Sequence, residues 1–457
     1  MPSPAARRKS EAGGVLTAAG CQRLQAAVEQ DCARTSQRPS FDKIAARAQL
    51  SADVAIAILY QQAPARRSEL QAFFSAFQLE LTDGDYQAAE LEAMPKSLPA
   101  RDLDADLQQL QGRQALLADL AAALQSDCRL VIFTGMPGIG KSTLLWELQR
   151  RLAATQWRWV RLDADQQPLS AIAFARAWLG DAAANACLGK AGEMARTALL
   201  AKAVEREAIG LAVDTAEQVL ADTQPEASLQ ESVLKIARAE QPQARLAIAT
   251  PHLPAAWQVI VAQPWARWIP LTGLSTAEAA ALFQTWGLEL TASTDQQCLA
   301  TIVSVYQGNP LALKLIAGEI RAYPYGGNLR AYWHDCGAEY ELEVDDDETT
   351  TAAARPNRTP WLRALVENAL RRLERHDPLA YQLLCLGAVN PRPSAAAPWQ
   401  FLIGDLPEAR QQQAWQALRQ RLWLEASPAD QGSLYRVPSF VRRIVLDQLP
   451  PLAPEHS

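Results

Sequence analysis

The feature that most constrains this chain is a glycine-rich stretch at residues 135–143, which reads Gly-Met-Pro-Gly-Ile-Gly-Lys-Ser-Thr. It matches the pattern G-x-x-x-x-G-K-[ST], in which backbone N–H groups surround phosphate oxygens. The run before it, at 130–133, is apolar and rich in β-branched and aromatic residues, which predicts a buried strand. Leucines at 144, 145, 148 and 152 then recur at helical spacing. Strand, loop and helix together predict a nucleotide-binding α/β domain.

The chemistry explains the residue types in this loop. Its glycines let the backbone turn tightly against phosphate. We expect Lys141 to reach the β- and γ-phosphates and the Ser142 hydroxyl to bind Mg²⁺, so the expected cofactors are ATP or ADP with Mg²⁺. The alternative is an ordinary glycine-rich turn between a strand and a helix. The residues that we predict to contact nucleotide here are Gly135, Pro137, Gly138, Ile139, Gly140, Lys141, Ser142 and Thr143.

Composition excludes several classes of protein. With 457 residues, 49% of them hydrophobic and 21% charged, the chain is expected to form about three globular domains and not to be disordered. A net charge of −6 gives no overall attraction to nucleic acid or anionic membranes. Seven cysteines without a C-x-x-C pair predict reduced thiols in a cytoplasmic protein, without a zinc site. The uncharged stretch at 247–266 contains three prolines, one histidine and two glutamines, which argues against a membrane span.

The chain order of predicted elements gives the fold class. We predict an α/β P-loop NTPase domain with a five-stranded parallel sheet, flanked by an all-α N-terminal domain, a helical domain and a C-terminal winged helix. The predicted segments are a helix-turn-helix-like N-terminal domain at 1–92, a linker at 93–104, the nucleotide-binding domain at 105–273, a helical domain at 274–335, an acidic flexible insert at 336–359 and the winged helix at 360–450.

The N-terminal segment at 41–59 resembles a helix-turn-helix, with Leu50 buried at the turn and Ser51 capping the second helix. Direct DNA binding is one interpretation. The second helix, however, contains no Arg, Lys, Asn or Gln before Gln61 that could read base edges. Gln49 also stands where such turns usually have glycine. Residues 1–92 are therefore expected to contact an effector protein, and the sequence argues against DNA as a partner.

A second apolar run, at 208–213, ends in Asp214. An acid at the end of a buried strand downstream of a phosphate loop predicts a Walker B aspartate, which orients Mg²⁺ through water. Many P-loop ATPases place another acid directly after it, but here Thr215 follows, and Glu217 is the only candidate base nearby. Thr250, at the end of a further predicted strand, could act as a sensor of the γ-phosphate. Binding is thus better supported than hydrolysis, which the sequence leaves open.

The stretch Tyr-Gln-Gly-Asn-Pro-Leu-Ala-Leu at 306–313 makes the comparison more specific. With the phosphate loop and Asp214 in this order, residues 105–450 resemble the NB-ARC family of STAND signal-transduction ATPases. The resemblance implies that Pro310 contacts adenine. Judged from the residues alone, Asn309-Pro310 is a turn that begins a helix. The resemblance also implies that the C-terminal helices and strand pair are a winged helix acting as a lid over the nucleotide, rather than a nucleic-acid reader.

Two positions depart from the family pattern. Pro251 and His252 follow Thr250, where many members have an arginine, and Pro438-Ser439 stand where many have a His-Asp pair. We therefore interpret the chain as a nucleotide-dependent signalling switch that uses ATP or ADP with Mg²⁺, with self-association as a further expectation. The first alternative is an ADP-bound scaffold or protein-interaction module without hydrolysis. The second is a DNA-binding regulator that acts through the N-terminal helices.

Overall fold

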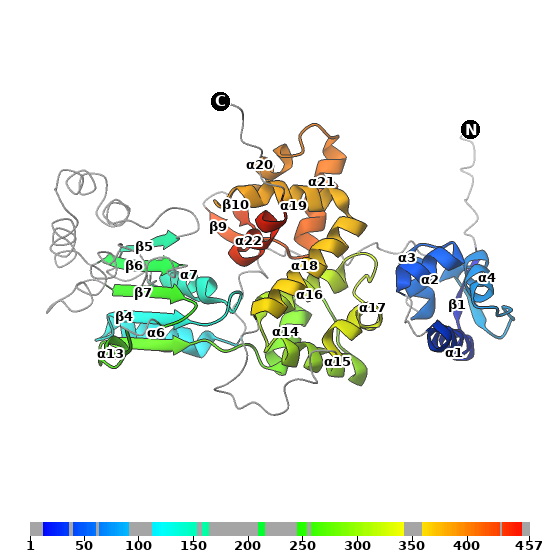
Figure 1. Ribbon diagram of the computed structural model, residues 1–457, viewed down its shortest axis with the longest axis horizontal. Coiled ribbons are helices and arrows are strands. Elements are labelled where there is room, and N and C mark those ends of the chain that lie inside the picture. Colours follow the sequence, from blue (N-terminus) through cyan, green and yellow to red (C-terminus); the bar gives the residue numbers. More distant parts are fainter. Residues whose placement is uncertain are drawn as a thin grey trace, which may run out of the picture.

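The computed structural model describes residues 12–35, 40–60, 64–90, 112–152, 158–163, 209–214, 245–253, 257–341, 359–429 and 432–449. An N-terminal module, a central group of helices and a parallel sheet follow one another along the long axis of the molecule (Figure 1). In these described ranges, no helix is both long enough and apolar enough to cross a membrane.

The N-terminal module combines helices with a small sheet. Its elements are β1 (Ala12–Leu16), α1 (Ala18–Thr35), α2 (Phe41–Ala48), α3 (Ala52–Leu59), β2 (Ala65–Arg66), α4 (Arg67–Ala76) and β3 (Tyr86–Glu90). The strands form an antiparallel sheet in the order β2-β1-β3. The prediction of an all-α domain was therefore wrong. β1 contains two adjacent glycines, which give no strand signal, and a Cβ on Gly14 would lie 2.6 Å from the Tyr86 ring.

The turn between α2 and α3 explains how Gln49 replaces the expected glycine. Gln49 adopts the left-handed conformation, with φ 57° and ψ 36°, and its N–H continues the helical hydrogen bonding to Ala45 and Ala46. Ser51 occupies the N-cap position of α3 in extended backbone, without a side-chain cap bond. A short turn with a non-glycine residue in the left-handed conformation thus joins α2 to α3.

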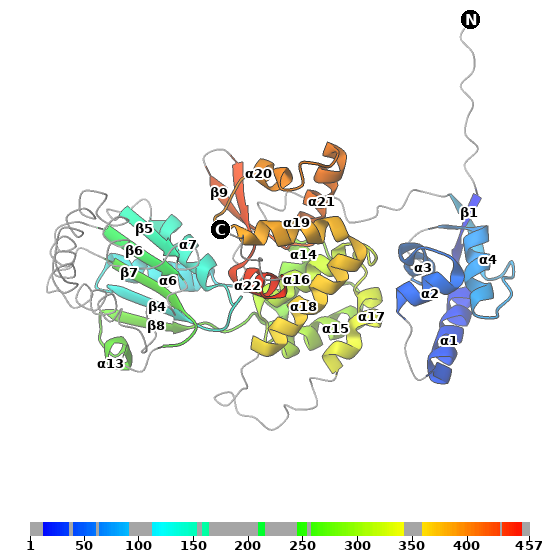
Figure 2. The same cartoon turned by 45° about the horizontal axis from the view of Figure 1, so that its top comes forward.

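The next domain along the chain contains a parallel sheet. Its elements are α6 (Gln114–Gln125), β4 (Leu130–Thr134), α7 (Lys141–Leu152), β5 (Arg158–Asp163), β6 (Ile209–Asp214), β7 (Arg245–Thr250), α13 (Gln258–Val261) and β8 (Ala266–Pro270). The strand order is β5-β6-β7-β4-β8, and all the pairs are parallel. Every residue of β4 and β7 is buried, as expected for strands inside a parallel sheet. Helices α6 and α7 pack together over one face (Figure 2).

This strand order decides where the site lies. The carboxyl ends of parallel strands meet at one edge of a sheet, so the loops after β4, β6 and β7 are neighbours. β7 pairs with β4 on one side and with β6 on the other, so the end of β7 lies between the two predicted phosphate and metal positions.

The remaining described elements are mostly helical. They are α14 (Thr276–Thr285), α15 (Ser293–Val305), α16 (Pro310–Arg321), α17 (Leu329–Glu341), α18 (Thr359–His376), α19 (Pro378–Val389), α20 (Ala396–Phe401), α21 (Glu408–Gln420), β9 (Glu425–Ala429), β10 (Gly432–Arg436) and α22 (Ser439–Gln448). β9 and β10 form an antiparallel hairpin. Ser275 caps α14. The predicted acidic insert began too early, because α17 continues to Glu341 and buries Cys336 and Tyr340.

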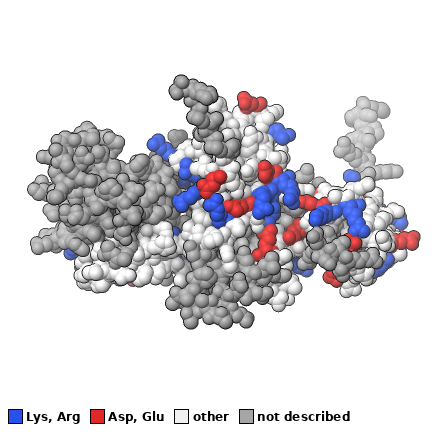
Figure 3. All heavy atoms as spheres, viewed as in Figure 1, with Lys and Arg blue, Asp and Glu red and all other residues white. Residues whose placement is uncertain are grey.

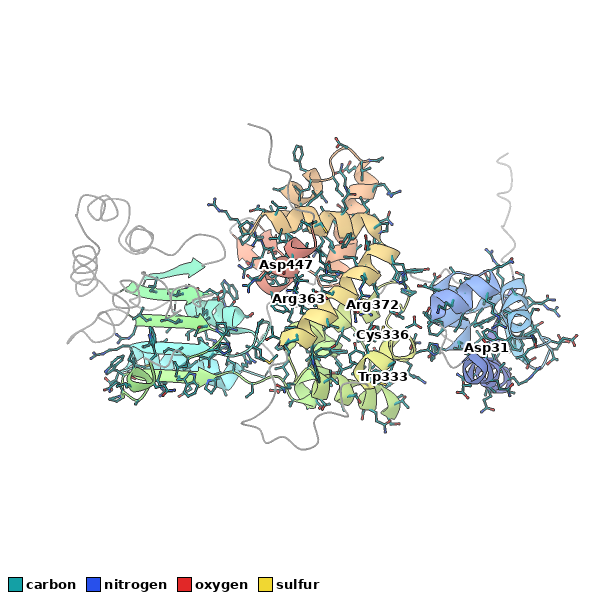
Figure 4. The ribbon with its side chains drawn as sticks, in the orientation of Figure 1. Asp31, Trp333, Cys336, Arg363, Arg372 and Asp447 are labelled. Atoms are coloured by element: carbon teal, nitrogen blue, oxygen red, sulfur yellow. The ribbon has the colours of Figure 1, made fainter. Side chains whose placement is uncertain are left out.

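One buried arginine joins three of these helices. Arg372 of α18 lies beside Cys336 of α17 (Figure 4). Its guanidinium donates to both carboxylate oxygens of Glu319 in α16, at 2.7 and 2.9 Å, and to Glu339 in α17 at 2.9 Å. Removing one partner from a buried pair of this kind costs about 3–5 kcal/mol, because it leaves an uncompensated charge. The start of the C-terminal region is thus fixed to α16 and α17.

The N-terminal module contacts α17. The backbone N–H of Phe41, at the start of α2, donates to Asp335 Oδ1 at 3.0 Å, and the Phe41 and His334 rings lie 4.7 Å apart. The Tyr60 hydroxyl donates to the Arg330 carbonyl oxygen at 3.2 Å. Burial raises the pKa of Asp335 to about 7. The module is therefore docked through contacts that include a titratable carboxyl group.

Candidate nucleotide-binding site

The phosphate loop connects β4 to α7, as predicted. Gly138 and Gly140 have φ of 74° and 96°, in the region that L side chains rarely adopt. Lys141 extends back over this loop, and its Nζ donates to the carbonyl oxygens of Gly135 at 2.6 Å and Met136 at 2.9 Å. The positive charge is therefore already held against the loop that would surround phosphates.

The predicted metal residues lie together. Ser142, in the first turn of α7, donates from Oγ to Asp214 Oδ1 at 2.9 Å. Asp214 ends β6 and is only 2% exposed. A hydroxyl and a carboxylate are hard oxygen donors, which is the ligand chemistry that Mg²⁺ prefers. The donor set at this edge of the sheet therefore fits Mg²⁺ in the presence of nucleotide phosphates.

The end of β7 borders the loop. Thr250 is buried, pairs in register with Thr134, and its Oγ1 donates to the His252 carbonyl oxygen at 3.2 Å. The Gly135 N–H donates to the Pro251 carbonyl oxygen at 3.1 Å, which joins the first residue of the loop to this strand end. Thr250 thus lies next to the loop, with its hydroxyl directed to its own backbone. Thr215 and Glu217 lie outside the described residues.

The helical domain contacts the loop directly. Asn309 Oδ1 accepts from the N–H groups of Leu311 at 3.0 Å and Ala312 at 3.3 Å, which caps α16. Its Nδ2 donates to the Pro137 carbonyl oxygen at 2.9 Å. A Cβ on Gly138 would lie 2.4 Å from Leu311 Cβ, so the glycine permits this close approach. Pro310, the predicted adenine contact, occupies the first position of α16 and is half-buried beside these contacts.

Of the remaining predicted loop residues, Ile139 is buried, Pro137 is half-buried and Thr143 is exposed. Two residues that the sequence reasoning did not assign also contact the loop. Asn309 was seen only as part of a helix start. Arg113 was not considered, although it is a basic residue that directly precedes a helix without any basic residue. Both contacts join segments far apart in the chain, so no local pattern indicates them.

These features define a P-loop nucleotide-binding fold, with the glycine loop at the end of β4 and an aspartate at the end of β6. Residues 109–253 match a protein-family model described as AAA ATPase domain, which implies binding of a nucleotide. A comparison with curated protein sequences gave no match.

Several solved structures are similar to this chain, all at low sequence identity. A STAND protein with a tetratricopeptide repeat sensor from Pyrococcus horikoshii is 16% identical, with a TM-score of 0.45, over 78% of this chain and 44% of that one. This chain thus spans less than half of the length of that protein. The Walker-type ATPase of Pyrococcus abyssi is 12% identical, with a TM-score of 0.34, over 74% and 96% of the two chains. Cdc6p from Pyrobaculum aerophilum is 12% identical, with a TM-score of 0.30, over 76% and 99%.

Proposed function

We propose that this chain is a nucleotide-dependent switch of the NB-ARC type within the STAND class, and that it binds ADP or ATP with Mg²⁺ between the parallel-sheet domain and α16. The observation that carries this proposal is the double contact that the Asn309 side chain makes. Its amide donates to the phosphate loop while its oxygen caps α16. A change in what the loop holds can therefore change how the helical domain is held.

The residues of the site have distinct roles in this proposal. The loop at 135–143 would hold the phosphates, Ser142 and Asp214 would hold Mg²⁺, the latter through water, and Pro310 would contact adenine. The nucleotide supplies the negative charge that competes for Lys141. Lys141 would exchange its two carbonyl contacts for phosphate oxygens. Hydrogen bonds of charged groups contribute about 1.5–3 kcal/mol each. Lys141 would therefore leave the two carbonyl oxygens only when phosphate oxygens are present to replace them.

The strength of the hydrogen bonds between the loop and α16 suits a switch. Two hydrogen bonds join them, from Asn309 to Pro137 and from the Leu311 N–H to the Gly138 carbonyl oxygen at 3.2 Å. At about 0.5–1.5 kcal/mol each, they amount to a few kcal/mol at most. A nearly complete change of state requires a difference of about 5.5 kcal/mol between the two nucleotides. The γ-phosphate with its Mg²⁺ is able to outweigh contacts of this size.

The C-terminal elements provide a candidate lid. We propose that α18 to α22, with the hairpin β9–β10, form the winged helix. It is connected to the nucleotide side of the molecule through Lys314 of α16, whose Nζ donates to the Leu424 carbonyl oxygen at 2.8 Å, directly before β9. A displacement of α16 would therefore be transmitted to the hairpin.

The N-terminal module is the proposed output. Its contacts include the hydrogen bonds Phe41–Asp335 and Tyr60–Arg330 and the ion pair of Asp42 with Arg375 of α18, and their release would expose it to an effector protein or to a second copy in the cytoplasm. DNA is not the favoured partner. On the face shown in Figure 3, basic and acidic side chains are interleaved and do not form a continuous basic patch.

A scaffold that retains ADP is the second candidate, because Thr215 follows Asp214 where a catalytic acid is expected. One experiment separates the two functions. The protein is purified without added nucleotide, denatured, and its released nucleotide is identified by chromatography. Phosphate release with ATP and Mg²⁺ and the protease pattern with ADP or a non-hydrolysable ATP analogue are then measured, with Lys141→Ala as the blank.

A switch gives bound ADP, slow turnover that depends on Lys141, and different protease patterns with the two nucleotides. Retained ADP without exchange or turnover would support the scaffold. If Lys141→Ala binds nucleotide as tightly as the unaltered protein, the assignment of the loop fails.

A further inference from the structure

Arg113 is a buried charge that contacts two functionally different segments. It directly precedes α6 and is only 8% exposed. Its Nη1 donates to the Ile139 carbonyl oxygen at 2.7 Å, inside the phosphate loop. Its Nη2 donates to the Thr272 carbonyl oxygen at 2.8 Å, in the segment between β8 and α14. The planar fork of a guanidinium can hold two carbonyl groups in fixed relative positions, which an ammonium cannot do.

The contact with the loop fixes the orientation of one of its peptide groups. The bond between Ile139 and Gly140 is one planar trans peptide, so its carbonyl and its N–H point in opposite directions. Because Arg113 holds the carbonyl oxygen, the Gly140 N–H is directed away from Arg113. An ideal Cβ on Gly140 would lie 3.0 Å from Arg113 Nη1, so the glycine leaves room for the guanidinium. Arg113 therefore sets the orientation of a loop N–H without lying in the loop itself.

The contact at Thr272 reaches the connection to the helical domain. The next residue, Gly273, is so close to the turn before α16 that its Cβ would lie 1.8 Å from the Gln307 carbonyl oxygen. The Leu274 N–H donates to the Gly308 carbonyl oxygen at 2.8 Å. The segment 272–274 is therefore packed against the same turn that presents Asn309 to the loop. A shift of Thr272 is therefore expected to displace this turn.

Glu278 completes the surroundings of the guanidinium. Its carboxylate accepts from the Ser275 N–H at 2.8 Å as part of the cap of α14. Burial lowers the pKa of Arg113, and the charge of Glu278 opposes this effect. A Cβ on Gly112 would lie 2.1 Å from Glu278 Oε1, which shows how closely the cap approaches the arginine segment. The guanidinium thus connects the loop, the segment after β8 and the first turn of α14.

We propose that Arg113 is a positioning residue that couples the state of the phosphate loop to the segment 272–274, and so transmits nucleotide identity to the helical domain. This inference rests on the proposed function. Arg113 acts through the Ile139 carbonyl on one side and the Thr272 carbonyl on the other. Loss of the fork should therefore disturb coupling more than binding.

The test uses the full chain with Arg113→Lys and, separately, with Arg113→Gln, so that the result does not depend on one replacement side chain. Arg267→Lys is the matched control, because Arg267 is an arginine of the same domain that makes an exposed pair with Asp119 at 2.6 Å. Affinities for ADP and for a non-hydrolysable ATP analogue are measured by competition with a fluorescent nucleotide. Hydrogen–deuterium exchange of the peptide covering 270–276 is measured with each nucleotide.

We expect the unaltered protein and Arg267→Lys to show at least about a threefold difference in exchange of this peptide between the two nucleotides. Both Arg113 variants should lose that difference, while both affinities fall by a similar factor of about ten or less. If Arg113→Lys and Arg113→Gln keep the difference, the coupling role is wrong. A lower melting temperature with unchanged affinities and an unchanged difference would also overturn it, because it would show a structural role only.

A failure of the proposed function would give a different result in this experiment. If the unaltered protein shows no nucleotide-dependent difference in exchange anywhere while Lys141→Ala abolishes binding, the chain binds nucleotide without switching, and the coupling proposal falls with the switch. If the difference is present in the unaltered protein but is unaffected at Arg113, only the role of Arg113 falls.

Discussion

Asn309 offers the sharpest test of how the two domains are joined, because one side chain makes two separable kinds of contact. Asn309→Ala removes the cap of α16 and the hydrogen bond to Pro137. Loss of an N-cap costs about 1 kcal/mol, and loss of a neutral hydrogen bond about 1 kcal/mol. Asn309→Ser keeps a capping oxygen but is too short to reach the loop, so we expect it to lose only about 1 kcal/mol.

These energies predict exchange rates. Since 1.4 kcal/mol corresponds to a factor of ten, the opening equilibrium should rise about 30-fold in Asn309→Ala and about fivefold in Asn309→Ser. Hydrogen–deuterium exchange of the peptide covering 308–314 reports the cap, and that of the peptide covering 135–143 reports the loop. Asn309→Ser should accelerate the loop peptide while leaving the α16 peptide nearly unchanged. If the loop peptide exchanges at the original rate in both variants, the Asn309 amide does not join the domains.

Three further predictions follow from single contacts. Gly308→Ala should unfold or displace the helical domain, because its Cβ would lie 1.9 Å from a backbone oxygen. Gly326→Ala, with φ 54° and open space around it, should lower the free energy of unfolding by only about 1 kcal/mol, and chemical denaturation compares the two variants. Burial raises the pKa of Asp335 from 3.8 to about 7 in the folded chain, so its contribution to stability is fully present below about pH 3.8 and is lost as the pH rises to about 7. The melting temperature should show this loss, and Asp335→Asn should lack it. Burial lowers the pKa of Lys314 from 10.5 to about 8. The contribution of Lys314 to the melting temperature should therefore rise as the pH increases from about 8 to 10.5, and Lys314→Met should lack this rise.

The strands of the parallel sheet, the cap of α14 and the P-loop were predictable because each is set by residues that are close together in the sequence. Apolar runs in a parallel sheet are continuous, so the predicted strands at 130–133 and 208–213 lie within one residue of the observed bounds of β4 and β6. The start of α14 was equally predictable, since Ser275 and Glu278 cap it with their own neighbours. The P-loop was identified because its residues are close in sequence and its chemistry requires particular residue types.

Other features depended on pairs of segments that are far apart in the chain. The strands β1 and β3 pair across about 70 residues, and neither contains a strong strand pattern, so the N-terminal sheet was not predicted. Gln49 accepts the left-handed turn conformation that glycine usually supplies, which its residue type does not indicate. The acidic insert was placed too early, because the burial of Cys336 and Tyr340 depends on their packing partners and not on the neighbouring acids.

The sequence by itself determined that this chain carries a phosphate loop, an aspartate after a buried strand and a helix that begins at Asn309-Pro310. These are matters of short-range pattern and backbone preference. Only the tertiary structure decided that Asn309 and Arg113 both hold carbonyl oxygens of that loop, and that Ser142 meets Asp214. A hydrogen bond between distant residues leaves no periodic trace in the sequence, because its geometry depends on the strand order and on the packing of the helices around it.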